Sequence, residues 1–322
     1  IKAQVALGRA KAAGIDIIVC DHHQPDAKLP DALVLNPKQN DCAYPFKELS
    51  GCGVAFKLLQ GLYQYLKLEQ SALFQSLDLV ALSIGADIVE MTDENRVLCA
   101  KGLAQLNAAP RPAFLAILEL AAKTLPLSLR DVVFVLAPRI NAAGRIASGK
   151  RAVDWMLSTD DAEIAALALD INTDNTARRA LDQEMTAQAL AQIEANPAFQ
   201  DQFSTIVYDP TWHKGVVGIV ASRLIETHYR PTIVLTESNG VLTGSARCMQ
   251  PLNLYDLLEC CQNDLVQFGG HQFAAGLTLL PEQLPAFKVA FENAVSSALS
   301  KQKLQRQIDI DTELEFKELG ER

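Results

Sequence analysis

A short apolar segment near the start of the chain ends in three residues with the chemistry of a metal or phosphate site. Residues 15–20 (IDIIVC) have the composition of a buried strand in a parallel sheet, and Asp21, His22 and His23 follow directly. In open α/β sheets, ligands bind at the carboxyl ends of such strands. A carboxylate and two imidazoles together suit manganese, iron or zinc, and magnesium less well. The segment therefore predicts an α/β fold with a site at the sheet edge, unless the histidines merely cap a turn.

The residues that follow alternate between a second strand and several helices. Residues 31–35 are predicted to form a strand, and helices are predicted over residues 50–66, 71–84, 94–106, 112–121 and 129–136. Small residues open the first of these helices, where backbone amides could approach a phosphate, although the same glycines also allow tight packing. Asp87 is expected in the loop after the second helix, as a ligand or as an ordinary turn residue.

A basic stretch without acidic residues covers residues 139–151. It carries Arg139, Arg145, Lys150 and Arg151, and Asn141 lies between the first two arginines. We predict that residues 138–145 form a loop in which guanidinium groups could hold a phosphodiester. A solvated surface is the alternative interpretation of the same charges.

A long helix and a second α/β unit make up most of the remaining chain. Residues 160–196 are almost free of glycine and proline and predict one helix, and the polar residues 172–175 suggest that it bridges two domains. Strands are predicted over residues 203–208, 231–235, 241–247 and 273–280, and helices over residues 216–227, 253–261 and 284–299. Gly269 and Gly270 predict a turn, and the alternation in residues 308–316 predicts a further strand.

Composition and charge narrow the functional classes. The 322 residues, 49% of them hydrophobic, are enough for two domains of ordinary size. A net charge of −9 and a pI near 5.1 argue against a protein that coats duplex DNA. Seven cysteines without Cys-x-x-Cys spacing predict reduced thiols in a cytoplasmic protein. Neither a 20-residue apolar span nor a secretory leader is present, so we expect a soluble protein without a membrane partner.

Several motifs resemble one enzyme family in their order and spacing. Asp21-His22-His23 resembles the signature of the DHH phosphoesterases. Residues 139–145 resemble a segment of the RecJ exonucleases, which degrade single-stranded DNA in the 5′→3′ direction. The remaining matches are to a later Asp motif of the family, at residues 85–89 and 94–96, and to the associated DHHA1 substrate domain, at residues 211–219, 244–247 and 269–271.

This resemblance implies a division of the chain into domains. Residues 1–158 would form a Rossmann-like, parallel-sheet DHH domain, residues 159–197 a connecting helix, and residues 198–300 a smaller α/β DHHA1 domain. Residues 301–322 would begin a third domain, an oligonucleotide-binding (OB-like) β-barrel. The implied activity is hydrolysis of single-stranded DNA from its 5′ end with two divalent cations, Mn²⁺ or Mg²⁺, in DNA repair and recombination.

The resemblance also implies roles for individual residues. His22 and Asp87 would bind metal, while His23 would act at the substrate phosphate and Asp21 would orient an imidazole. Asn141 and Arg145 would hold the phosphodiester. The residues that would bind the terminal phosphate and the neighbouring nucleotide are His213, Ser245, Arg247, Gly269, Gly270 and His271. The implied partners are single-stranded DNA, preferably with a 5′ phosphate, and a helicase or a single-strand-binding protein.

One motif of the family has no counterpart in the chain. The Asp-x-Asp motif and a further Asp that precede the DHH signature are absent, and the chain begins at Ile1 with a helix almost at once. We therefore expect a fragment that folds but is nearly inactive, with an exposed strand edge or apolar face. Two alternatives stay open: an oligoribonuclease or nucleotide phosphatase of the same superfamily, and a relative that binds DNA or replication proteins without hydrolysis.

Overall fold

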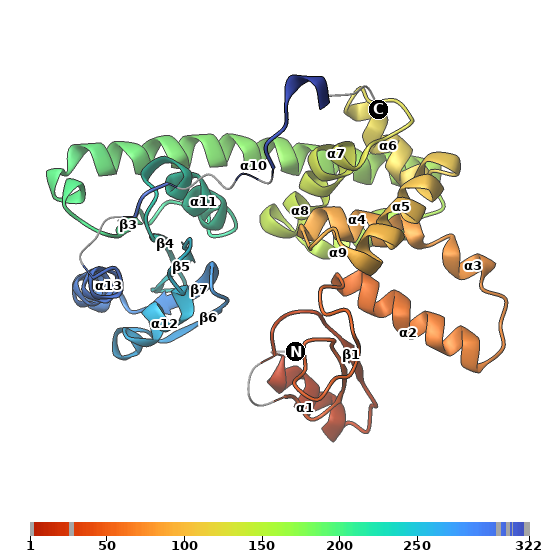
Figure 1. Ribbon diagram of the computed structural model, residues 1–322, viewed down its shortest axis with the longest axis horizontal. Helices are drawn as coiled ribbons and strands as arrows, with labels where there is room; N and C mark the ends of the chain where they lie inside the picture. Colours follow the sequence, from red (N-terminus) through yellow and green to blue (C-terminus); the bar gives the residue numbers. More distant parts are fainter. Residues whose placement is uncertain (1–2, 26–28, 301–303, 307–309, 311, 319–322) are drawn as a thin grey trace. The chain divides into compact units, whose positions relative to one another are not determined.

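The structure, a computed structural model, describes residues 3–25, 29–300, 304–306, 310 and 312–318. The chain divides into unit 1 (Ile1–Arg179) and unit 2 (Ala180–Arg322). The boundary lies inside α10 (Asp161–Ala195), the long green helix in Figure 1. The single helix predicted for residues 160–196 is thus confirmed.

The predicted first strand is present in unit 1, but it is short. β1 (Ile18–Cys20) pairs in parallel with β2 (Leu33–Leu35), with Ile18 opposite Leu33 and Cys20 opposite Leu35. Asp21 follows β1 directly, so the parallel pairing and the place of the Asp-His-His segment at a strand's carboxyl end are confirmed. The expectation of a buried strand is wrong, because Ile18 and Leu33 are 52% and 60% exposed.

Helices make up most of unit 1. They are α1 (Gln4–Ala12), α2 (Gly51–Tyr65), α3 (Ser71–Phe74), α4 (Leu77–Asp87), α5 (Asp93–Ala108), α6 (Pro112–Leu120), α7 (Leu129–Asp131), η1 (Val132–Leu136), α8 (Ala137–Ile146) and α9 (Gly149–Leu157). Most lie within a few residues of the predicted helices. The helix predicted over residues 71–84 is wrong in two respects: it is interrupted between α3 and α4, and α4 continues to Asp87.

Residues 138–145, predicted as a loop, lie in helix α8. Pro138 lies in the first turn of α8, which follows η1 (Val132–Leu136) without a break, and as a proline it has no N–H to donate to that preceding turn. The preceding η1 is a π-helical turn, and the Val135 carbonyl in it accepts a hydrogen bond of 2.7 Å from Arg139 Nη1. Arg139 therefore stabilises the helical junction instead of extending from a loop.

The first part of α10 belongs to the core of unit 1. Its apolar residues are buried in one cluster with residues of α6 and α9, including Ile164, Ala168, Ile171, Phe114 and Trp155. Two polar residues of the 172–175 run are also held inside the unit. Asn172 Oδ1 accepts a hydrogen bond from Arg139 Nε (2.9 Å), and Asp174 pairs with Arg151 (2.7 Å).

Unit 2 is built on one mixed sheet. Its strands are β3 (Thr205–Tyr208), β4 (Thr232–Ser238), β5 (Val241–Arg247), β6 (Gln267–Gly270) and β7 (Ala274–Leu279), in the order β3-β4-β5-β7-β6. β3 and β4 are parallel, and the other pairs are antiparallel. The four predicted strands are confirmed. The turn predicted at Gly269 and Gly270 is wrong, because both residues pair with β7 as part of β6.

The helices of unit 2 cover both faces of this sheet. They are α11 (Val217–His228), α12 (Leu254–Glu259) and α13 (Leu284–Ala298), with short turns η2 (Pro197–Gln200), η3 (Gln262–Asp264) and η4 (Pro281–Gln283). Ile233 and Leu235 of β4 are buried against α13, and Figure 1 shows α11 on the other side. Successive strand residues point to opposite faces, so Val234, between Ile233 and Leu235, points toward α11. Ser245 pairs with Val234 and therefore points to the α11 face, as does Arg247 two residues later.

The strand expected over residues 308–316 is wrong at its end. Phe316 lies in the 3-10 turn η5 (Phe316–Glu318), and residues 310 and 312–315 have no regular structure. Residues 307–309 and 311 lie outside the described residues. The OB-like domain and the domain bounds therefore stay predictions.

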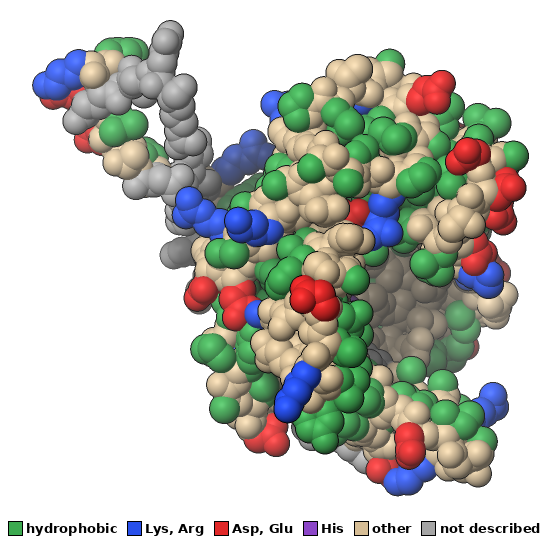
Figure 2. Space-filling model, turned by 90° about the vertical axis from the view of Figure 1, so that its right-hand side faces the viewer, with side chains coloured by type: hydrophobic (Ala, Val, Ile, Leu, Met, Phe, Trp, Pro, Cys, Tyr) green, Lys and Arg blue, Asp and Glu red, His purple; other side chains and the backbone are tan. Residues whose placement is uncertain are grey.

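Apolar side chains are exposed on unit 1. Figure 2 shows hydrophobic side chains gathered in patches between charged ones on one face. α2 and the residues after it contribute Leu59, Leu62, Tyr65, Leu66 and Leu68, which are between 42% and 84% exposed. Over the part of the chain that the structure describes, no helix combines the length and apolar composition needed to cross a bilayer.

Candidate metal and phosphate sites

His22 and Asp87, predicted as metal ligands, lie side by side in unit 1. His22 follows the end of β1, and Asp87 is the last residue of α4. His22 Nε2 and Asp87 Oδ2 are 3.0 Å apart, and the two side chains are 15% and 44% exposed. Burial lowers the pKa of His22 although Asp87 acts in the opposite direction. A neutral imidazole is the form that binds a cation.

Asp21 holds the second histidine of the motif. Its Oδ1 accepts hydrogen bonds from the backbone N–H groups of His22 (2.7 Å) and His23 (3.0 Å) and lies 2.7 Å from His23 Nδ1. Partial burial alone would raise the pKa of the Asp21 carboxyl, but these hydrogen bonds keep it well below its usual range. Because an ionised carboxylate only accepts, His23 Nδ1 carries the proton of this bond. The His23 ring, 60% exposed, is thereby oriented.

Two neighbours of the histidines are not evident from the sequence. Asn36, 2% exposed, donates from Nδ2 to the carbonyl of His23 (2.8 Å) and accepts from the backbone N–H of Lys38 (2.9 Å). An Asn before a Pro suggests only a turn. Gly51, the first residue of α2, lies against His22, because an added Cβ would be 3.5 Å from His22 Cδ2. Ser50 caps α2 by accepting a hydrogen bond from the Gly53 N–H (3.2 Å).

The donor atoms of His22 and Asp87 fit a divalent cation. One imidazole nitrogen and one carboxylate oxygen are ligands that manganese takes readily. Among the described residues, no group of three or more His, Cys, Asp or Glu side chains lies close enough together to hold a metal ion. His22 and Asp87 therefore fit as two ligands of a cation whose other positions go to water, substrate or further ligands.

Asn141 and Arg145 share one side of α8, because they lie four residues apart in the helix. The other basic residues of the 139–151 stretch are occupied within unit 1. Lys150 pairs with Asp154 (2.8 Å), and Arg151 and Arg139 contact α10 as described above. These three cations therefore have partners within unit 1, and contact of the basic stretch with a phosphate backbone stays a prediction.

Ser245 and Arg247 form a hydrogen-bonded pair in unit 2. Arg247 Nη1 donates to Ser245 Oγ (2.7 Å), and Arg247 Nε donates to Ser222 Oγ on α11 (3.2 Å). α11 approaches closely because Gly218 has no side chain: an added Cβ would be 3.0 Å from Ser245 Oγ and 3.1 Å from Arg247 Nη2. Two hydroxyls thus orient a guanidinium, the group that binds phosphate by paired hydrogen bonds.

The structure gives Gly270 a packing role. Gly270 pairs with Ala275, and an added Cβ would be 2.3 Å from the Ala274 carbonyl oxygen. Only glycine therefore allows β6 and β7 to pair here. His271 follows in the turn, where its backbone N–H donates to the Ala274 carbonyl (2.8 Å). His213 precedes α11, and its Nδ1 accepts a hydrogen bond from the Gly215 N–H (3.1 Å).

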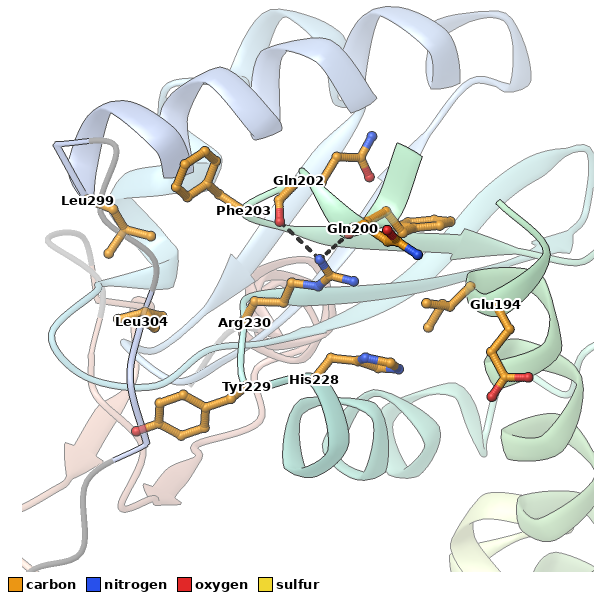
Figure 3. A pocket seen from close by; sticks show the side chains of 11 residues that line it. Glu194, Gln200, Gln202, Phe203, His228, Tyr229, Arg230, Leu299 and Leu304 are labelled. Atoms are coloured by element: carbon orange, nitrogen blue, oxygen red, sulfur yellow. Dashed lines mark hydrogen bonds between the residues drawn. The ribbon is translucent and has the colours of Figure 1, made fainter. Parts of the chain in front are cut away.

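A separate pocket of about 470 Å³ in unit 2 is lined by none of the predicted site residues. Figure 3 shows Arg230 inside it, with the guanidinium turned toward the loop before β3. Arg230 donates to the Gln202 carbonyl (2.9 Å) and to Thr205 Oγ1 (2.7 Å). These bonds hold the loop and the first residue of β3, so Arg230 has a structural role in the pocket wall.

Two family models match the chain. The DHH family, N-terminal domain, matches residues 1–84, and the DHHA1 domain matches residues 201–297. The single-stranded-DNA-specific exonuclease RecJ of Bacillus subtilis is 39% identical over 297 residues, which are 91% of this chain and 37% of the relative. The Escherichia coli RecJ is 35% identical over 330 residues, 97% of this chain and 57% of the relative. The chain thus spans well under two thirds of the length of these relatives.

Solved structures give the same result. RecJ from Thermus thermophilus in complex with Mn²⁺ has a TM-score of 0.81 and 32% identity over 92% of this chain and 44% of that chain. An exonuclease RecJ bound to manganese has a TM-score of 0.75 at 32% identity, over 92% of this chain and 73% of that chain. The predicted fold class, a parallel-sheet DHH part followed by a smaller α/β DHHA1 part, is thereby confirmed. The chain belongs to the RecJ family.

Proposed function

We propose that the protein containing this chain hydrolyses single-stranded DNA from its 5′ end, in DNA repair and recombination. The observation that carries the proposal is the His22–Asp87 pair, 3.0 Å apart, in a member of the RecJ family. The relatives named above are single-strand-specific exonucleases, and the solved ones hold manganese. The expected helicase or single-strand-binding partners stay a prediction.

His22 and Asp87 would hold a divalent cation, Mn²⁺ or Mg²⁺. When bound, such a cation offsets the charge of the scissile phosphate and activates water for attack. Of the two residues, the imidazole favours Mn²⁺ and the carboxylate suits either ion. The two cations expected for the reaction need ligands besides this pair.

The exposed His23 ring is the candidate for contact with the scissile phosphate. Asp21 engages His23 Nδ1, so a phosphate would meet the opposite side of the ring, at Nε2. Removing Asp21 would remove the hydrogen bond that orients the imidazole, and this bond would no longer fix the proton on Nδ1. Asp21 thus supports His23, while His22 faces Asp87.

We assign the binding of the substrate's terminal phosphate to residues of unit 2. Arg247, oriented by the hydroxyls of Ser245 and Ser222, would bind it by charge-assisted hydrogen bonds. His213, Gly269, Gly270 and His271 complete the predicted binding residues of this unit. Asn141 and Arg145, on one side of α8, would hold the phosphodiester in unit 1.

Metal binding by the chain tests the assignment of the cation ligands. His22→Ala and Asp87→Ala should each weaken Mn²⁺ binding, measured by electron paramagnetic resonance, and leave the melting temperature in metal-free buffer nearly unchanged. Asp256→Ala on α12 removes a carboxylate from the other unit and serves as the control. Equal unfolding of both site variants without metal would instead identify the pair as structural.

Strand-end selectivity tests the substrate assignment. The intact protein should degrade single strands with a 5′ phosphate faster than strands with a 5′ hydroxyl. Arg247→Ala should reduce this ratio by about 10- to 100-fold, because charge-assisted hydrogen bonds are worth about 1.5–3 kcal/mol. Equal rates on both ends in the unmutated protein would refute the assignment, and preferred digestion of short RNA would favour the oligoribonuclease alternative.

A further inference from the structure

The residue after Asp87 has a strained backbone. Ile88 has φ 54° and ψ 42°, in the left-handed region that β-branched residues rarely adopt. Its side chain is 83% exposed, so packing does not compensate the strain. Because Ile88 ends α4, its conformation sets the direction in which the chain leaves Asp87. Such strain persists only where surrounding contacts hold the backbone in place.

Asn95 of α5 makes such a contact. It is 0% exposed, and its Nδ2 donates to the carbonyl of Glu90, two residues after Ile88 (2.9 Å), and to the carbonyl of Glu48 (2.6 Å). Among the described residues, Asn95 Oδ1 has no hydrogen-bond partner. A buried polar atom without a partner is unfavourable. The two hydrogen bonds of Nδ2 are thus the bonds that hold the buried Asn95 side chain in place.

The Glu48 carbonyl belongs to the segment that supports the histidines. The Glu48 carboxylate pairs with Lys38 Nζ (2.9 Å), and the Lys38 backbone N–H donates to Asn36 Oδ1 (2.9 Å). Asn36 Nδ2 in turn donates to the carbonyl of His23 (2.8 Å). Asn95 thus connects the loop after Asp87 with the segment that carries both histidines, entirely within unit 1.

We propose that Asn95 is a positioning residue for the metal pair, an inference that rests on the proposed cation site at His22 and Asp87. By holding the Glu90 carbonyl, Asn95 keeps Ile88 in the left-handed region and the Asp87 carboxylate 3.0 Å from His22. Without this contact, Ile88 relaxes to a favoured conformation and the end of α4 moves, taking Asp87 away from His22.

Asn95→Ala in the chain of residues 1–322 tests this role. Glu94 separately anchors the start of α5 to Tyr44 (2.8 Å) and Lys57 (3.0 Å), so we expect the variant to fold. The dissociation constant for Mn²⁺, measured from free Mn²⁺ by electron paramagnetic resonance, should rise by about 10- to 100-fold, as when other residues that orient metal ligands are lost. The urea midpoint in metal-free buffer is measured in parallel.

Replacement of Ile88 separates positioning from general stabilisation. Asn adopts the left-handed region more readily than Ile, so Ile88→Asn alone should raise the urea midpoint and leave Mn²⁺ affinity unchanged. Added to Asn95→Ala, it should restore most of the lost affinity, because residue 88 no longer depends on the Asn95 contact. Ala122→Asn is the matched control: Ala122 has φ 51°, follows α6 and is exposed, so the change relieves the same kind of strain elsewhere. It should raise stability without restoring affinity.

Several outcomes would overturn the inference. They are unchanged Mn²⁺ affinity in Asn95→Ala, equal restoration by Ile88→Asn and Ala122→Asn, and an unchanged urea midpoint in Ile88→Asn. The last measurement tests the strain even if Asn95→Ala does not fold. Failure of the metal site itself has a different signature: Mn²⁺ affinity that does not respond to His22→Ala removes both proposals.

Discussion

At the scale of single residues, the proposed phosphate-binding pair of unit 2, Ser245 and Arg247, depends on the absence of a side chain at Gly218. Arg247 reaches Ser222 only because α11 lies close to β5, and Gly218 permits that approach. Ser245 and Arg247 are recognisable in the sequence because residues 244–247 resemble a segment of the DHHA1 domain. Ser222 is not, because it comes from another element and lies outside these segments, and the match of residues 211–219 does not reveal that Gly218 lies against Ser245 and Arg247.

Gly218→Ala should weaken selection of a 5′ phosphate without removing a charge. The new Cβ would lie 3.0 Å from Ser245 Oγ and 3.1 Å from Arg247 Nη2, so both groups must shift by a few tenths of an ångström. We expect the ratio of rates on phosphorylated and hydroxyl ends to fall, by a smaller factor than in Arg247→Ala. Gly8→Ala, where no atom lies within 4 Å of the added Cβ, should leave the ratio unchanged. A normal ratio in Gly218→Ala would show that α11 does not set the position of Arg247.

At the scale of elements, α4 and α5 contact each other through a glycine. The two helices lie side by side in Figure 1, and an added Cβ at Gly102 of α5 would be 2.0 Å from the Leu77 carbonyl oxygen and 2.7 Å from Ala81 Cβ of α4. α4 carries Asp87 at its end and α5 carries Asn95, so this contact also supports the proposed metal pair, His22 and Asp87.

The same substitution in two helices should therefore have opposite effects. Gly102→Ala should lower the free energy of unfolding by about 1–3 kcal/mol, because the core cannot accept the added methyl without a shift of α4. Gly61→Ala in α2, where no atom lies within 4 Å, should raise it by about 0.5–1 kcal/mol through better helix propensity. Urea unfolding measures both, and a stabilised Gly102→Ala variant would contradict the close contact.

The start of α7 has a pH-dependent stabilisation. Asp131 Oδ1 accepts a hydrogen bond from Lys123 (2.8 Å), and Asp131 Oδ2 accepts bonds from the Ser128 hydroxyl (2.7 Å) and backbone N–H (3.0 Å). These bonds, that of Lys123 foremost, keep the pKa of the Asp131 carboxyl well below its usual range. Its stabilising effect is present above the unfolded-state pKa, about 3.9, and is lost as the pH falls toward the lower folded-state pKa.

Asp131→Asn should accordingly be less stable than the unmutated chain at pH 7, and the difference should shrink as the pH is lowered below about 4. Urea unfolding at a series of pH values measures the difference. Lys123→Met, which removes the main partner, should reproduce part of the loss with the same pH dependence. A difference that grows toward low pH would mean that the neutral carboxyl is the favoured form in the fold.

Most elements of the chain are predictable from local pattern, and the failures have physical causes. α10 is evident because 35 residues lack glycine and proline. α8 is hidden because Pro138 suggests a break, whereas the helical backbone continues across it from the π-helical turn η1 into α8. β6 is hidden because Gly269 and Gly270 resemble a turn, and only their pairing with β7 makes them a strand. The loop after Asp87 is held at the Glu90 carbonyl by Asn95, and although residues 94–96 resemble a family motif, no local pattern reveals this contact.

At the scale of the whole molecule, each unit has its own core, and α10 runs through both units. The apolar residues of unit 1 around Phe114 and those of unit 2 around Phe291 form separate clusters. α10 contributes Ile164, Ala168 and Ile171 to the first cluster. Its polar residues are held in each unit by an arginine: Arg151 on Asp174 in unit 1, and Arg223 on the buried Asp182 (2.7 Å) in unit 2. Separate cores predict separate unfolding of the two units.

The two tryptophans of the chain allow a direct test, since Trp155 is buried in unit 1 and Trp212 in unit 2. Trp212→Phe leaves a fluorescence reporter for unit 1, and Trp155→Phe leaves one for unit 2. Phe114→Ala and Phe291→Ala, both at fully buried positions, should each cost about 3–5 kcal/mol in their own unit. We expect each substitution to lower the urea midpoint of the reporter in its own unit and to leave the other unchanged. If either substitution lowers the urea midpoint of both reporters equally, α10 couples the two cores into one cooperative structure. In that case, destabilising unit 2 at Ser245 and Arg247 would also affect the proposed metal pair, His22 and Asp87, in unit 1.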